Sequence, residues 1–202
     1  PVFTRSAPSP KGEDKTLSPS DLGGAKALAG EAGLDMDAAL SYGTLVHELL
    51  EHLPLMGADA REVFLERLAR THPAEMIARA EDEAEAVLNT PALAPLFAET
   101  TLAEVPVTGS LGDQRLHGTI DRLVIAEDRI LAVDFKTNRV VPGTAEACPD
   151  GLLRQMGAYA HMLRQIYPDR RIDTAILWTH SGSLMPLPHD LVINAFDSTV
   201  LP

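Results

Sequence analysis

Two aspartates and a lysine stand inside apolar stretches near the middle of the chain, at Asp121, Asp134 and Lys136. Burying charged groups without partners is costly, and Asp is disfavoured within strands. Each aspartate taken alone would fit a solvent-facing edge strand, but the combination favours a functional site. Carboxylate oxygens are the ligands that Mg²⁺ and Mn²⁺ prefer. These residues therefore predict a divalent-metal site with a lysine beside it.

The elements that must position these side chains form a predicted β-hairpin over residues 118–138. Two β-branched and aliphatic runs flank a polar break at residues 126–129. Alternation along the second strand places Asp134 and Lys136 on one face, and Leu131, Val133 and Phe135 on the other. Asp121 lies on the partner strand, so the hairpin can bring the two carboxylates together.

Further elements are predicted on both sides of the hairpin. The pattern from Ser41 is helical, residues 58–88 indicate two more helices, and residues 103–108 indicate an edge strand because they contain a proline. A helix is expected at residues 152–167, a strand at 171–179 and a final edge strand near residue 185. A helix between two strands implies a parallel crossover, so we expect an α/β fold with a mixed central sheet.

Four other polar residues are candidates for the site. His47 lies in the first helix, but the residue four positions later is Glu51, so the pair cannot form the two-histidine motif of zinc proteases. Taken alone, His47 also fits a structural histidine. Glu104, on the proline-containing strand, is a possible further acidic ligand. Gln155 and Tyr159 are four apart on one helix face and form either a surface pair or a pair that reaches the site.

The composition is that of a globular protein of one domain. The chain has 202 residues, 45% of them hydrophobic, and a single cysteine, Cys148, which excludes an internal disulfide and a multi-cysteine metal site. It has no apolar run of membrane-spanning length and no signal pattern, which fits a cytoplasmic protein without a membrane partner. Residues 1–20 are predicted to be a linker or a poorly ordered arm. Because the chain starts at Pro1, we expect a fragment of something longer.

The net charge of −12 opposes nucleic-acid binding, which gains from basic residues. The charge is unevenly distributed: residues 1–114 hold 8 basic and 19 acidic residues, whereas residues 115–171 hold 9 and 7. Only the segment with the candidate site is not acidic. Candidate phosphate contacts in it are Arg122, Arg129, Arg139 and Arg154. We expect the isolated chain to bind DNA weakly.

The motifs together resemble the PD-(D/E)XK nuclease superfamily, in its RecB-like branch. The resemblance covers about residues 17–180 and rests on four separated motifs: Gly43-Thr-Leu-Val-His47, Gly118-Thr-Ile-Asp121, Asp134-Phe-Lys136 and Gln155-Met-Gly-Ala-Tyr159. It is closest to the C-terminal nuclease domain of AddA-type helicase-nucleases, which act in double-strand break repair. It implies a restriction-endonuclease-like core at about residues 100–202, preceded by a helical part at about 21–98, within a single nuclease domain over residues 21–202.

The resemblance also implies a role for each motif residue. His47, Asp121, Asp134 and the main-chain carbonyl of Phe135 would bind Mg²⁺ or Mn²⁺, Lys136 would be the catalytic lysine, and Gln155 with Tyr159 would form the Gln-x-x-Tyr motif. The partners implied are a single DNA strand from a double-strand end, upstream helicase domains of the same polypeptide and an AddB-like subunit, in the nucleoid. The chain has no phosphate-loop motif for ATP, and one cysteine cannot hold an iron–sulfur cluster.

The predicted chemistry is phosphodiester hydrolysis by metal-activated water. A bound cation can polarise the phosphate and activate water near neutral pH, while Lys136 stabilises the developing charge. Two other hypotheses remain open from sequence. One is a catalytically silent nuclease fold used for docking, and the other is a metal-dependent hydrolase of small phosphorylated substrates, which would favour a deep apolar pocket.

Overall fold

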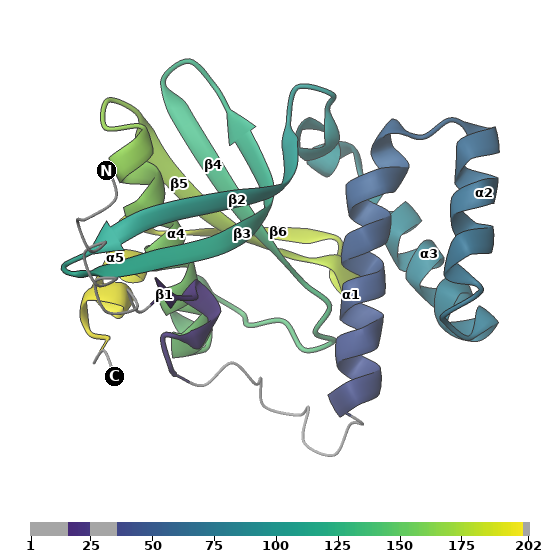
Figure 1. The fold of residues 1–202 in the computed structure, drawn as a ribbon, viewed down its shortest axis with the longest axis horizontal. Coiled ribbons are helices and arrows are strands. Elements are labelled where there is room, and N and C mark those ends of the chain that lie inside the picture. Colours follow the sequence, from purple (N-terminus) through teal and green to yellow (C-terminus); the bar gives the residue numbers. More distant parts are fainter. Residues whose placement is uncertain (1–15, 25–35, 200–202) are drawn as a thin grey trace, which may run out of the picture.

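A computed structural model describes residues 16–24 and 36–199 (Figure 1). The helices are α1 (Met36–His52), α2 (Ala58–Leu68), α3 (Ala74–Leu88), α4 (Asp150–Ile166) and α5 (His189–Asp197). The strands are β1 (Thr16–Leu17), β2 (Leu102–Leu111), β3 (Gln114–Ile125), β4 (Arg129–Lys136), β5 (Arg171–Trp178) and β6 (Ser183–Leu187). The chain therefore has the predicted α/β class, with a mixed sheet flanked by helices.

The sheet runs in the order β1-β3-β4-β5-β6, and β2 pairs with β3. The predicted hairpin is confirmed: β3 and β4 are antiparallel, with Arg122 opposite Val133. The predicted crossover is also confirmed, because β4 and β5 are parallel along their whole length and α4 connects them. Strand β6 pairs antiparallel with β5 at the edge. Strand β4 consequently lies inside the sheet, but its pairing with β3 ends at Val133, and residues 134–136 at its carboxyl end pair with β5 alone.

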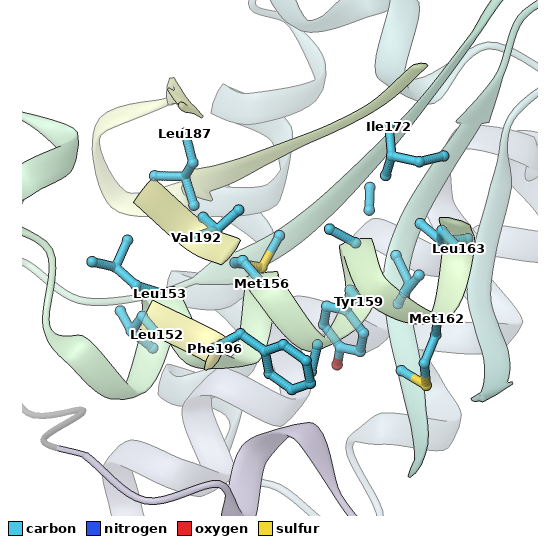
Figure 2. Close-up of a cluster of buried hydrophobic side chains, with 14 of the residues drawn as sticks. Leu152, Leu153, Met156, Tyr159, Met162, Leu163, Ile172, Leu187, Val192 and Phe196 are labelled. Atoms are coloured by element: carbon cyan, nitrogen blue, oxygen red, sulfur yellow. The ribbon is translucent and has the colours of Figure 1, made fainter. Parts of the chain in front are cut away.

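Helices cover both faces of the sheet (Figure 1). Val133 and Phe135 on one face belong to a hydrophobic core that also includes residues of α1, α2 and α3, with α2 farthest from the sheet (Figure 1). The apolar stripe of α1 explains its orientation, because Leu45 and Leu49 are fully buried. Helices α4 and α5 cover the opposite face, where Met156 and other α4 residues meet residues of α5 (Figure 2). The two faces alternate along β4 as the sequence predicts.

The side chains of β3 stop alternating regularly between the two faces of the sheet at Asp121, and this irregularity is called the slip. Ile120 and Leu123, three positions apart, both belong to the core under α4 and α5, whereas a regular strand would repeat every two residues. On the partner strand β2, Glu104 would stand opposite Asp121, but regular pairing is recorded only on either side of it, and its φ is +47°. A residue other than Gly rarely has a positive φ, and such strain gathers at functional sites.

Two features of the fold differ from expectation. Residues 1–15 of the predicted arm lie outside the described residues, but Thr16–Leu17 pairs in parallel with β3, and Pro19–Asp21 forms a 3₁₀ helix packed on α4. The linker or poorly ordered arm predicted over residues 1–20 therefore does not extend through residues 16–20, which are ordered against the fold. Helix α5 was not predicted; its short segment is held by α4, where a Cβ on Gly157 would lie 2.2 Å from the carbonyl oxygen of Val192.

Candidate metal and nuclease site

Three side chains from three elements converge beside the slip in β3. His47 of α1, Glu104 of β2 and Asp121 of β3 each offer a ligand atom, and these atoms lie within 4.8 Å of one another. His47 Nδ1 is 3.5 Å from Asp121 Oδ1. The irregular backbone at Glu104 and Asp121 lets both carboxylates meet a helix that lies on one face of the sheet. All three residues are half-buried, so the group remains open to solvent.

The main chain of Phe135 fixes two members of this group. Its N–H donates to Asp121 Oδ2 at 2.5 Å, and its carbonyl accepts from His47 Nε2 at 3.1 Å. A carbonyl can only accept, so Nε2 carries the proton and Nδ1 faces Asp121. Metal-bound histidines usually donate their other ring N–H in this way. In this arrangement the carbonyl that was expected to be a metal ligand orients the histidine.

A second cluster lies on the α4 side of β4. Lys136 Nζ is 2.5 Å from Asp134 Oδ2, and Gln155 Nε2 donates to Asp134 Oδ1 at 2.7 Å. The Tyr159 hydroxyl is 3.3 Å from Gln155 Nε2 and donates to the carbonyl of Thr119 at 2.6 Å. The pair from α4 therefore holds β4 through Asp134 and β3 through Thr119, two residues before Asp121.

The charges of the site favour a bound cation. Burial raises the pKa of Glu104, and the negative charge of Asp121 raises it further. Burial also raises the pKa of Asp134, against the effect of Lys136. For His47, burial lowers the pKa, but Asp121 and Asp134 outweigh it and hold the pKa above its usual value. A divalent ion would compensate these crowded carboxylates, so the oxygen-rich donor set fits Mg²⁺ or Mn²⁺.

The predicted ligand Asp134 is not part of the three-residue group in the described structure, because both of its oxygens face the lysine and the glutamine. Each oxygen retains a lone pair, so Asp134 stays a proposed ligand. Lys136 keeps its charge: burial lowers its pKa, but Asp134 and Asp121 more than restore it.

The predicted phosphate contacts differ in their surroundings. Arg122 is 3% exposed, donates to the carbonyl of Leu50 at 2.6 Å and stacks over Phe97, so it is withdrawn from the candidates. Arg154 lies near Asp150 and the carbonyl of Leu22. Arg139 is exposed. The tight packing of Arg122 reflects its place on β3, where the slip turns it toward α1.

A contact of Thr179 with Lys136 and Glu83 lies near the site, and the sequence gives only a weak indication of it. Thr179 Oγ1 donates to the carbonyl of Lys136 at 3.1 Å and lies 2.6 Å from Glu83 Oε1. Glu83 belongs to an acidic run at residues 81–85, a composition typical of a solvated helix face, but its side chain is 9% exposed. Helical spacing from the buried Ala80 could have placed Glu83 at the margin of the packed stripe.

Among the described residues, none of the helices has both the length and the apolar character that crossing a bilayer would need. No match is found among curated proteins. Two solved structures match this chain, and the first of them is similar in fold. A candidate exonuclease from Eubacterium rectale has a TM-score of 0.58 at 12% identity, over 84% of this chain, which spans 66% of the length of that protein. The protein SSO0001 has a TM-score of 0.37 at 12% identity, over 94% of this chain and 76% of that one.

The family model of the PD-(D/E)XK nuclease superfamily matches residues 22–182. That range contains both clusters of the site and all strands from β2 to β5. The match therefore covers the polar residues of the candidate site as well as the strands that bring them together. The chain belongs to the PD-(D/E)XK nuclease superfamily.

Proposed function

We propose that this chain is a metal-dependent deoxyribonuclease that hydrolyses phosphodiester bonds as the nuclease part of an AddA-type helicase-nuclease, in double-strand break repair and recombination. The observation that carries the proposal is the meeting of His47, Glu104 and Asp121 within 4.8 Å, directly beside the Asp134–Lys136 pair. A docking module would have no need for this concentration of buried and half-buried charge, which costs stability without a function.

Each group has a defined task in such a reaction. His47, Glu104 and Asp121 would hold Mg²⁺ or Mn²⁺, with Asp134 as the neighbouring acidic ligand. When bound, the cation supplies Lewis-acid polarisation of the phosphate and eases deprotonation of a water molecule. Lys136 is a cation at neutral pH, so it can orient the attacking water and stabilise charge that develops on the phosphoryl oxygens. The reaction needs no covalent nucleophile.

Gln155 and Tyr159 are positioning residues in this proposal. They contact Asp134 and Thr119 and thereby fix the separation of β4 and β3 at the site. Exonuclease action, a single strand delivered from a double-strand end, upstream helicase domains and an AddB-like partner rest on the resemblance of the four motifs. The same holds for a place in the cytoplasm near the nucleoid.

The test is cleavage of single-stranded DNA, labelled separately at each end, by the purified chain. We expect cleavage with Mg²⁺, none with EDTA, and a loss of at least about a hundredfold in Asp134→Ala and Lys136→Ala, because each removes charge stabilisation of the transition state. Asp128→Ala, in the exposed β3–β4 turn, is the matched control and should cleave normally. Cleavage that survives Asp134→Ala would refute this site. An inactive chain that also fails to bind Mg²⁺ would support a docking module.

A further inference from the structure

Four arginines gather at the end of the sheet away from the candidate site. Arg129, Arg164, Arg170 and Arg171 line an open hollow of about 860 Å³ at the amino ends of β4 and β5. Its apolar floor comes from the sheet, with Leu131, Ala175 and Leu184 among the lining residues. These arginines stand out because the chain as a whole carries a net charge of −12.

Three of the four guanidinium groups are held in place. Arg171 Nε is 2.8 Å from Asp173 Oδ1, and Arg129 Nε is 3.6 Å from Asp173 Oδ2. Arg170 donates to the carbonyl of Ala126 at 3.0 Å. Ordered guanidinium groups lose little further entropy when they bind an anion, which favours binding.

The hollow retains a positive excess after these contacts. One carboxylate, Asp173, faces two guanidinium groups, and the only other acidic residue of the lining is Asp169. Four arginines therefore stand against two aspartates, with His189 also at the rim. The guanidinium fork matches the paired oxygens of a phosphate, and phosphate contacts by Arg are the main source of affinity for nucleic acid.

We propose that this arginine groove binds the sugar–phosphate backbone of single-stranded DNA at a distance from the bond that is cut. The proposal rests on the nuclease function proposed above and adds a second contact with its substrate. Along β5, Arg171 marks the groove and Trp178 is paired with Lys136 of the site. Seven residues at about 3.3 Å each separate them by about 23 Å. A strand that touches both places must therefore extend several nucleotides beyond the cut.

The groove also offsets the net charge of −12, which opposes DNA binding by the chain. An acidic protein repels DNA at long range, and a local basic surface restores attraction where the strand must lie. The contact is made to the backbone and carries no sequence information, which suits a nuclease that degrades strands of any sequence.

The experiment compares DNA binding by the double variant Arg164→Gln/Arg171→Gln with a matched double variant, Arg70→Gln/Arg115→Gln, which removes equal charge outside the groove. Binding of labelled oligothymidylate is measured by fluorescence anisotropy in EDTA over a range of NaCl. The groove variant should bind a long oligonucleotide at least about fivefold more weakly. The slope of log K against log salt is negative, and its magnitude should decrease by about 0.7 for each arginine removed. Arg171 is 74% exposed on its side chain, so unfolding is not expected, and thermal midpoints check this.

The possible outcomes are distinguishable. An equal loss in groove and control variants overturns the groove, as does unchanged affinity in the groove variant. If polyglutamate binds through these arginines and DNA does not, the groove serves an acidic protein segment and the proposal is overturned. Arginine-dependent DNA binding supports the groove even when Mg²⁺ produces no cleavage, so failure of the nuclease function is visible separately. In the Arg164→Gln background, tighter binding with Arg171→Lys than with Arg171→Gln would confirm that charge is responsible.

Discussion

At the scale of single residues, the site depends on which partner each carboxylate oxygen contacts. Asp121 directs Oδ1 to His47 and Oδ2 to the N–H of Phe135. Asp134 directs its two oxygens to Gln155 and Lys136. Each carboxylate is therefore fixed in orientation before any ligand arrives, which reduces the reorganisation that metal and substrate binding require.

Gln155→Leu should destabilise the metal-free protein by about 1–3 kcal/mol, because it leaves a buried carboxylate oxygen of Asp134 without its donor. It should also weaken Mg²⁺ binding, since the carboxylate becomes harder to ionise. Urea unfolding and calorimetric Mg²⁺ titration measure the two effects. Tyr159→Phe is the control: it keeps the amide contact with Asp134 and should weaken Mg²⁺ binding less. Equal Mg²⁺ affinities in the two variants would contradict the assigned role of Gln155.

The pKa of His47 predicts a pH dependence of stability. Because Asp121 and Asp134 hold this pKa above 6.5, the protonated ring stabilises the metal-free fold. That stabilisation is complete below about pH 6.5 and is lost as pH rises through the folded-state pKa. The difference in free energy of unfolding between the wild type and His47→Gln, measured in EDTA, should therefore shrink as pH rises. A difference that grows with pH would mean that the carboxylates do not stabilise the charged ring.

At the scale of elements, the link between α1 and β3 determines whether His47 reaches Asp121. Arg122 follows Asp121 directly and donates to the carbonyl of Leu50, in the last turn of α1. The last carbonyls of a helix lack partners within the helix, so this guanidinium also caps α1. The contact joins the helix that carries the histidine to the strand that carries the aspartate.

Arg122→Met should cost about 1–3 kcal/mol of stability, because a buried carbonyl loses a charged donor while the apolar packing on Phe97 is kept. Mg²⁺ affinity should fall as well, since α1 is less firmly held against β3. Denaturant unfolding and metal titration are the measurements. Arg67→Met, at an exposed arginine of α2 over Phe64, is the control and should leave metal affinity unchanged. The link is disproved if Arg122→Met loses stability but binds Mg²⁺ like the wild type.

At the scale of the whole molecule, one sheet separates two hydrophobic cores and contributes side chains to both. Val133 and Phe135 belong to the core with α1 and α3, and Ala132 belongs to the core with α4. The candidate site lies where these layers meet at the carboxyl end of β4. A ligand held there contacts α1, β2 and β3 together, so its binding should stabilise the whole fold against unfolding.

A divalent cation should therefore raise the free energy of unfolding. At a free concentration about a hundred times the Kd, the expected gain is about 2.7 kcal/mol. Thermal unfolding with Mg²⁺ or Mn²⁺, compared with EDTA, measures it as an upward shift in Tm. Asp121→Asn keeps an acceptor for the Phe135 N–H and removes the charge, so it should abolish the shift while remaining folded. An identical shift in Asp121→Asn would place the cation elsewhere.

The sequence by itself was sufficient for the hairpin and for the class of the candidate site, a group of carboxylates that could hold a divalent cation. Alternation in β4 fixed which side of the strand carries Asp134 and Lys136, and the polar break at residues 126–129 fixed the turn. These features are local, because a strand repeats every two residues and a turn is encoded by its own composition. The parallel crossover from β4 to β5 followed from a helix lying between two strands.

Tertiary structure alone decided how the side chains are shared between the two clusters. The slip at Asp121 and the positive φ of Glu104 have no signal in the local sequence, and they lie where β2 and β3 meet His47 of α1. The burial of Arg122 follows from that slip, which turns its guanidinium toward α1. The grouping of four arginines into one groove likewise depends on parallel pairing, which places Arg129 beside Arg171 although forty-two positions separate them in the chain. A local sequence pattern indicates on which face of a strand or helix a side chain lies. Long-range packing decides which partner that side chain contacts there.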